Sequence, residues 1–175
     1  MTVGPLERSD VRLRPLGDED ADDLYVLHND LELKALAQSY PLPVSRGEVK
    51  RWMSDLAQRS DDATWGIVDL AKDEFVGVVR LMGIDWRSRK AELGIYLASG
   101  ARNRGIGSQT LELLREWSFG YLGLRRLSAR VLASNEAGVQ FFTREGFAIE
   151  GTLREDAYIR GRYENVVILG LMGPN

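Results

Sequence analysis

The sequence contains no cysteine and only one histidine, His28. Without cysteine there is no disulfide framework, no thiolate nucleophile and no thiolate metal site. The usual zinc sites need several imidazoles or thiolates, so no metal ion is expected. A Ser-His-Asp triad would have to be built on His28 alone.

Long apolar runs and a strong charge excess are missing as well. No run of about eighteen apolar residues occurs, so no membrane span is expected. The N-terminal stretch MTVGPLERSD has no apolar segment, which predicts that a secretory signal is absent. A net charge of −3 argues against nucleic acid as the main partner. We therefore expect a cytoplasmic protein that binds neither membranes nor nucleic acid.

The 175 residues, 44% of them apolar and 28% charged, are typical of one globular domain, placed over residues 1–175. Acidic residues gather early, in GDEDADDLYVLHNDLE (17–32). One interpretation is a solvated helix start capped by Asp18. The other is an acidic surface that attracts a cationic substrate such as a polyamine.

Periodicity and turn signals predict a mixed order of strands and helices. A capping box, Ser45 and Glu48, marks the start of one of the helices. The order favours a single α+β or α/β sheet of about seven strands with helices on both faces. Strands are predicted over 11–16, 64–70, 74–84, 90–99, 125–133, 147–159 and 164–172, and helices over 18–30, 31–40, 45–60, 105–123 and 134–146.

A glycine-rich turn with two arginines, SGARNRGIGSQT (99–110), joins a predicted strand to a predicted helix. Unpaired N–H groups at a helix N-terminus bind phosphate, and glycine lets a ligand approach the backbone closely. A P-loop needs a lysine that is absent here, and the dinucleotide fingerprint needs a third glycine where Thr110 stands. The turn therefore holds a nucleotide phosphate, holds another phosphorylated cofactor, or is a bare turn.

The pattern Arg-x-x-Gly-x-Gly, Arg102 to Gly107, closely resembles the pyrophosphate-binding loop of the GNAT superfamily of acyl-CoA-dependent N-acyltransferases. NEAGVQFFTREGF (135–147) is similar to the second cofactor element of that family. The strand AELGIYL and the tail EGTLREDAYIRGRYENVVILGLM resemble the RimJ/RimL-type branch, which includes spermidine acetyltransferases with similar tails. The resemblance implies a GNAT fold with a mixed, mostly antiparallel sheet, and acetyl-CoA as the co-substrate.

The same resemblance assigns the residues that hold acetyl-CoA. Leu97 pairs its backbone with the pantetheine arm, as an added strand does. Asn135 hydrogen-bonds pantetheine or is only a helix N-cap, two roles that are compatible. Phe142 and Arg144 line the thiol and adenine sides. The side chains of the two arginines, at positions 102 and 104, add charge-assisted bonds to the pyrophosphate. The pyrophosphate is received by the backbone amides of Arg102, Asn103, Arg104, Gly105, Ile106, Gly107 and Ser108.

An amine that is protonated at neutral pH must lose a proton before it attacks a thioester, so a general base is needed. The resemblance implies Glu92, because its strand would run beside the acetyl group and the family often has a glutamate there. The alternatives are a salt bridge to Lys90 or an arginine, or a solvent-facing strand position. Glu92, Gly94 and Tyr96 share one face if the strand is regular, whereas a bulge would break that alternation. Backbone N–H groups of residues 94–97 are placed to polarise the thioester carbonyl.

The general acid is not evident from the sequence. Many family members have a tyrosine where this chain has Phe142, and RimL-like members often have a serine where it has Gly138. A thiol of pKa about 8.5 leaves with modest help, so catalysis is not excluded. Water or one of four side chains could supply that help: Ser134, Tyr96, Tyr158 or Tyr163.

We interpret three of the tryptophans and the histidine first as residues that pack in the fold, and not as residues of a site. Trp117 lies on the apolar side of its predicted helix and is expected in the core. Trp52 and Trp65 are also expected in the core, or else form the floor of an acceptor pocket. His28 is expected on a helix surface or in packing, without a catalytic role.

The leading hypothesis is an N-acetyltransferase that moves acetyl from acetyl-CoA to a primary amine in a ternary complex. The acceptor is a small-molecule amine or a peptide N-terminus. The alternative is a non-catalytic acetyl-CoA-binding regulatory module, which the two missing general acids would suit. A nucleotide-binding protein is the third hypothesis. Exposed strand edges in the tail suggest a possible homodimer.

Overall fold

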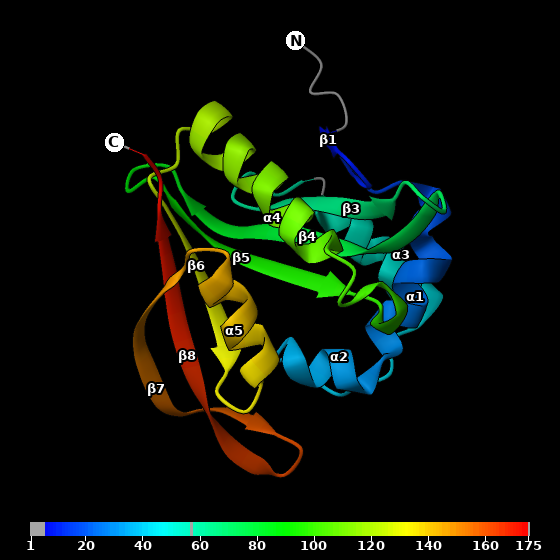
Figure 1. Ribbon diagram of the computed structural model, residues 1–175. Helices are drawn as coiled ribbons and strands as arrows, with labels where there is room; N and C mark the ends of the chain where they lie inside the picture. Colours follow the sequence, from blue (N-terminus) through cyan, green and yellow to red (C-terminus); the bar gives the residue numbers. More distant parts are fainter. Residues whose placement is uncertain (1–5, 57, 175) are drawn as a thin grey trace.

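The structure, a computed structural model, describes residues 6–56 and 58–174 (Figure 1). The first five residues of MTVGPLERSD, part of the stretch used for the signal-peptide expectation, lie outside the described residues. Among the described residues, no helix is both long enough and apolar enough to cross a bilayer.

Eight strands form one sheet in the order β1-β2-β3-β4-β5-β6-β8-β7. All neighbouring pairs are antiparallel except β5 and β6, so the predicted mixed, mostly antiparallel sheet is confirmed. One strand more than expected is present, because the three-residue β1 is too short to show a periodicity. The strands are β1 (Leu6–Arg8), β2 (Val11–Arg14), β3 (Ala63–Asp69), β4 (Glu74–Asp85), β5 (Lys90–Leu97), β6 (Arg126–Leu132), β7 (Ala148–Ile159) and β8 (Arg162–Met172).

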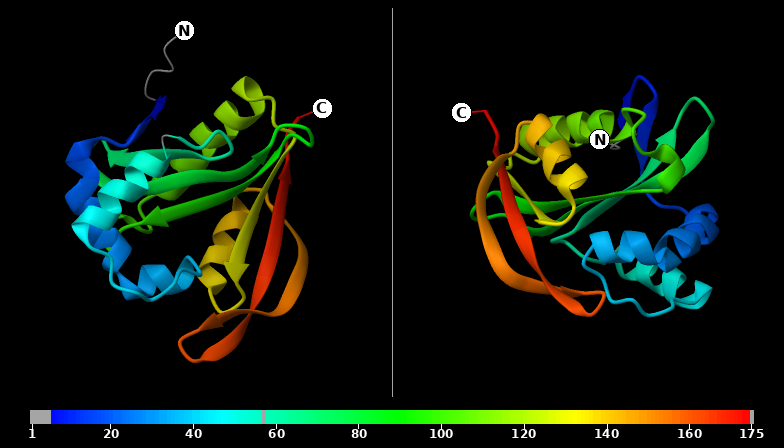
Figure 2. Two further views of the ribbon diagram at one scale, coloured as in Figure 1. Left: turned by 180° about the vertical axis from the view of Figure 1, so that it is seen from behind. Right: turned by 60° about the horizontal axis from the view of Figure 1, so that its bottom comes forward.

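Helices cover both faces of the sheet, as predicted. Figure 2 shows α4 and α5 on one face and α1, α2 and α3 on the other. A π-helical turn, Trp117–Tyr121, extends α4, and Gly123 follows with a positive φ of 63°. The helices are α1 (Ala21–Asn29), α2 (Leu31–Leu36), α3 (Arg46–Leu56), α4 (Ile106–Glu116) and α5 (Glu136–Arg144).

Two helix ends illustrate local control of the fold. The capping box of α3 forms as expected, because the Glu48 carboxylate accepts from the Ser45 amide at 2.7 Å and the Glu48 amide donates to Ser45 Oγ at 3.2 Å. The second helix ends at Leu36, before the predicted end. A Schellman motif closes it: the Ser39 amide bonds the Lys34 carbonyl at 2.9 Å, and Gln38 is left-handed with φ 54°.

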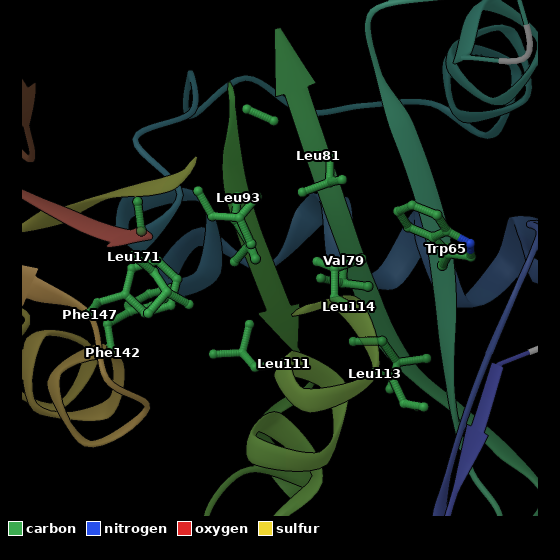
Figure 3. Close-up of a cluster of buried hydrophobic side chains, with 14 of the residues drawn as sticks. Trp65, Val79, Leu81, Leu93, Leu111, Leu113, Leu114, Phe142, Phe147 and Leu171 are labelled. Carbon is green, nitrogen blue, oxygen red and sulfur yellow. The ribbon is translucent and has the colours of Figure 1, made fainter. Parts of the chain in front are cut away.

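The main core lies between the sheet and the pair α4 and α5 (Figure 3). Leu93 of β5 and Leu111 and Leu114 of α4 are almost completely buried there. Trp65 packs edge-on against Trp117, with ring centroids 4.7 Å apart, so the core interpretation of both is confirmed. A smaller cluster around Val78 lies on the opposite face, under α1 and α3.

The acidic stretch 17–32 is largely engaged in local structure. Asp20 is buried and forms a bidentate pair with Arg14, with both N–O distances 2.7 Å. Asp30 caps α2 by accepting from two backbone amides. Asp18 was expected to cap the first turn, but Gly17 occupies that position and its amide donates to Asp20 at 2.8 Å.

The predicted homodimer stays a prediction. β7 is an edge strand of the sheet, the kind of strand that can pair with a second chain. The β7–β8 hairpin also exposes large apolar side chains, namely Ile149, Leu153, Tyr158 and Tyr163.

Candidate active site

The sheet opens between β5 and β6. Their parallel pairing covers only three residue pairs and ends at Glu92 and Ser128. Beyond that point β5 stays paired with β4 as far as Leu97, and β6 stays paired with β8 as far as Leu132. Figure 1 shows the two strands diverging. A cleft of about 670 Å³, called the large cleft below, lies at this opening. It is lined by the end of β5, by α2 and α5, and by residues 102, 103, 105, 107 and 108 of the glycine-rich turn.

The glycine-rich turn presents a row of free amides. Gly105 is the N-cap of α4, with φ 79°, and Asn103 also has a positive φ, 59°. In the described part of the chain, none of the backbone N–H groups of residues 103–108 has a hydrogen-bond acceptor. Consecutive free amides at a helix N-terminus attract anions, since the helix dipole adds positive charge there.

Gly107 has a steric reason to be glycine. A Cβ at this position would lie 3.2 Å from the Phe141 ring, which is tighter than ordinary contact. Phe141 of α5 thus covers the first turn of α4 and lines the large cleft. The sequence assigned no role to Phe141, although it stands beside Phe142. Phe142 also lines the cleft, but it is buried and packs against Phe147 with ring centroids 5.1 Å apart.

The two arginines of the turn differ in their surroundings. Arg102 lines the large cleft and donates from Nε to the Leu97 carbonyl at 3.1 Å. Arg104 does not line the cleft, because its guanidinium pairs with the buried Asp69 at 2.8 Å. Ile106 likewise points into the core. The structure thus engages the Arg104 side chain with Asp69, so its expected bond to phosphate stays a prediction, while the backbone amides at positions 104 and 106 are free.

The remaining predicted cofactor residues lie around the cleft. Asn135 caps α5, since its Oδ1 accepts from the Gly138 amide at 3.0 Å, and it also lines the cleft. Ser108 donates to Glu145 Oε1 at 2.5 Å. The cleft-lining set includes the predicted Glu92, Leu97, Arg102, Asn103, Gly105, Gly107, Ser108, Asn135, Phe142 and Arg144.

Glu92 is half-buried at the point where β5 and β6 separate. Burial raises the pKa of its carboxyl group, and nearby Arg130 partly opposes the rise. No cation of the described residues lies within 4 Å of the carboxylate, so the alternative of a salt bridge is not what the structure shows. The pairing of β4 and β5 is continuous from Glu92 to Leu97, so the expectation that Glu92, Gly94 and Tyr96 share a face is confirmed.

Tyr96 is the one cleft residue among the four candidate general acids. Its ring folds back over Gly94, where a Cβ would lie 2.8 Å from the hydroxyl oxygen. Burial raises the pKa of the Tyr96 phenol, Arg80 opposes the rise and Glu92 adds to it. Tyr158 and Tyr163 are exposed on the β7–β8 hairpin and contact each other, with ring centroids 5.1 Å apart.

A second cavity of about 240 Å³, called the small cavity below, adjoins the large cleft and shares Leu33, Ala37 and Tyr96 with it. It lies on the face covered by α1, α2 and α3. Trp52 lines it, and His28 contacts the Trp52 ring edge-on at 4.7 Å between centroids. Lys34 and Arg80 are the two lysine or arginine side chains among the described residues that line it. Sequence reasoning missed both cations, because no local pattern brings α2 and β4 together.

No group of three or more His, Asp or Glu side chains within residues 6–56 and 58–174 is arranged to hold a metal ion.

Replacing Arg104 by Gln should lower the free energy of unfolding by about 1–3 kcal/mol, because Asp69 would stay buried without its charged partner. The matched control is Arg46→Gln. Arg46 pairs with Asp22 at the surface, with both side chains more than half exposed, so that change should stay within about 0.5 kcal/mol. Urea denaturation of both variants measures the difference. Equal stabilities would contradict a structural role for the Arg104–Asp69 pair.

Comparison with known proteins agrees with this geometry. The family model of the acetyltransferase (GNAT) domain matches residues 10–148. Spermidine N(1)-acetyltransferase of Escherichia coli (strain K12) is 27% identical over 159 residues, covering 90% of this chain and 83% of that protein. The ribosomal-protein-serine acetyltransferase of the same strain is 30% identical over 95 residues, covering 54% of this chain and 53% of that protein.

A solved structure shares the fold. Spermidine N-acetyltransferase from Vibrio cholerae, in complex with CoA and spermine, superposes with a TM-score of 0.88 at 24% identity. The match covers 94% of this chain and 96% of that one. Since the family model spans most of the sequence, the chain belongs to the GNAT acetyltransferase family and is an acetyl-CoA-dependent N-acetyltransferase.

Proposed function

We propose that this protein transfers acetyl from acetyl-CoA to the primary amine of a small molecule, by direct attack in a ternary complex. Glu92 is the general base. The observation that carries the proposal is a half-buried carboxylate with a raised pKa at the fork between β5 and β6, facing the large cleft. A base of raised pKa lies nearer to the operating pH, which favours proton transfer.

Acetyl-CoA fits the large cleft on three observations. The free amides of residues 103–108 offer a site for the pyrophosphate, with Arg102 beside them. Gly107 leaves the backbone accessible where a Cβ would meet Phe141. The separation after Glu92 leaves one edge of β5 unpaired, so Leu97 can receive the pantetheine arm as a strand does. The solved relative from Vibrio cholerae is a CoA complex, which supports this assignment.

The protein's own groups then carry out three tasks. Acetyl-CoA supplies the acetyl group as a thioester, and transfer forms a C–N bond and breaks the C–S bond. Glu92 takes a proton from the acceptor nitrogen, directly or through water. Those backbone N–H groups of residues 94–97 that face the unpaired edge of β5 would stabilise the developing oxyanion. Tyr96 offers its O–H to the departing sulfur, since a phenol is protonated at neutral pH and burial raises the pKa of Tyr96 further.

A small acceptor is favoured over a peptide N-terminus. The small cavity of about 240 Å³ adjoins Tyr96 and is covered by α1 and α2, and a volume of this order accommodates a small molecule. The matched relatives include proteins named for spermidine and one named for a ribosomal protein, so both acceptor classes occur among them. A non-catalytic acetyl-CoA-binding module would have no need of Glu92 and Tyr96 on a single cleft-facing strand.

Gly107→Asp should weaken acetyl-CoA binding by about tenfold or more, because the side chain adds bulk against Phe141 and negative charge beside the pyrophosphate. Gly120→Asp is the matched control, since Gly120 is exposed and has nothing within 4 Å of its added Cβ. Isothermal titration calorimetry with acetyl-CoA compares the two variants. Equal affinity in the Gly107 variant would refute the loop assignment.

Glu92→Gln should lower kcat on the order of 10²-fold at neutral pH while the affinity for acetyl-CoA stays nearly unchanged. The base must be deprotonated, so wild-type activity should fall as the pH drops through the raised pKa of Glu92. The variant should lose that limb of the pH–rate profile. An unchanged kcat and an unchanged acid limb would remove Glu92 from the role of base.

Tyr96→Phe should lower kcat by about tenfold, because the variant loses one hydrogen bond to the negatively charged sulfur that leaves. Tyr158→Phe removes an exposed hydroxyl outside the cleft and should leave kcat unchanged. Release of free thiol from acetyl-CoA at saturating acceptor measures both. Equal rates in the two variants would show that the Tyr96 hydroxyl does not assist the leaving group.

A further inference from the structure

The charge of the small cavity does not suit a polyamine. Of the described residues that line the large cleft and the small cavity, Glu92 is the one acid. The small cavity itself contains Lys34 and Arg80 and no carboxylate from the described chain. A polyamine carries several ammonium groups, and like charges in a partly buried cavity repel strongly. None of the acids of residues 17–32 lines either space.

Lys34 is a buried cation with spare hydrogen-bonding capacity. The residue is only 8% exposed, and its ammonium group donates to the Leu42 carbonyl. An ammonium group has three donors, and no carboxylate of the described residues lies within 4 Å of it. Glu48 is the acid near enough to interact with Lys34, but its carboxylate is bonded to Ser45 and it does not line the cavity. Buried charge without a counter-ion is unfavourable, so an anion here would be stabilising.

Arg80 adds a second, incompletely neutralised cation. Its guanidinium pairs with Asp62 at 3.2 Å, and the same Asp62 oxygen also pairs with Arg59 at 2.7 Å. One carboxylate therefore serves two guanidinium groups. The Arg80 guanidinium also lies over the Trp52 ring, 5.6 Å from its centroid, which fixes it at the cavity wall.

His28 of α1 also lies in these positively charged surroundings. Burial lowers the pKa of His28, and Lys34 and Arg80 lower it further. The imidazole is thus neutral at pH 7 and offers one donor and one acceptor to a ligand. α1, α2 and β4 together direct donors into a space that contacts Tyr96, next to the site of acetyl transfer.

We infer that the acceptor amine carries an anionic group, a carboxylate or a phosphate, which binds between Lys34 and Arg80 in the small cavity. This inference rests on the proposed function, since it assumes that the cavity holds the acceptor. The apolar walls, including Leu27, Val44 and Trp52, suit an uncharged carbon skeleton between the amine and the anion. The acceptor class is therefore an amino acid or a related amine with a single oxyanion, and not a polyamine.

The test compares matched acceptors by thiol release from acetyl-CoA. L-methionine and L-phenylalanine are each paired with their amide and their decarboxylated amine, and O-phosphoethanolamine is paired with ethanolamine. Spermidine and spermine complete the panel. At least about a tenfold higher kcat/KM is expected for the anionic member of a pair, the value of one charge-assisted hydrogen bond. The carboxylate and phosphate arms then distinguish the two anions.

Lys34→Gln should remove that preference by raising KM for the anionic acceptor while KM for acetyl-CoA is unchanged. Arg80→Gln is the second variant, in case the first one does not fold. Lys50→Gln, which changes an exposed lysine of α3, should keep the wild-type preference. A merely structural role for Lys34 would lower activity toward charged and neutral acceptors alike, and that result would overturn the inference.

The outcomes separate the inference from the proposed function. Faster acetylation of the neutral amines, or of spermidine, would refute the anionic acceptor while the acetyltransferase stands. Thiol release no faster than the acceptor-free blank across the whole panel would contradict both, because neither the anionic nor the neutral nor the polycationic small amines tested would then be substrates. A preference for the anionic partners that Lys34→Gln abolishes would establish the site.

Discussion

The early separation of β5 from β6 is the constraint on which the site depends. Three parallel residue pairs join these strands, and the last contains Glu92. Each strand is held on its other side, β5 by β4 and β6 by β8, so the opening has two rigid walls. The glycine-rich turn follows β5 and α5 follows β6, so both elements that we propose to hold acetyl-CoA lie at this opening. A continued β5–β6 ladder would leave no room for a ligand between the strands.

Local patterns predicted most of the fold. The capping box of α3 and the alternation along β5 each depend on neighbours in sequence, and both form as expected. The turn glycines also behave as the sequence indicates, since Gly105 needs its positive φ. β1 was missed because three residues are too few to show a periodic pattern of apolar side chains. The end of α2 was misplaced because Gln38 adopts a left-handed conformation that glycine usually takes.

The parts of the site that sequence reasoning missed depend on distant partners. The Arg104 side chain was expected to bind phosphate, yet it forms an ion pair with the buried carboxylate of Asp69 at the end of β3. Lys34 and Arg80 come from α2 and β4, and only the tertiary fold brings them to one cavity. Clustering of charge along the chain was a poor guide. The acids of residues 17–32 gather in sequence, but Asp20 neutralises Arg14 and Asp30 caps a helix.

Gly94 shows why the two spaces meet where they do. Glu92, Gly94 and Tyr96 lie on one face of β5, with Glu92 toward the large cleft and Tyr96 shared with the small cavity. A side chain at position 94 would collide with the Tyr96 hydroxyl and crowd Met82 of β4, because its Cβ would lie 2.8 Å and 3.1 Å from them. The glycine therefore lets the tyrosine ring fold back along β5, toward the proposed base Glu92. A thioester in the cleft and an amine in the cavity would then meet over the one position of this face that has no side chain.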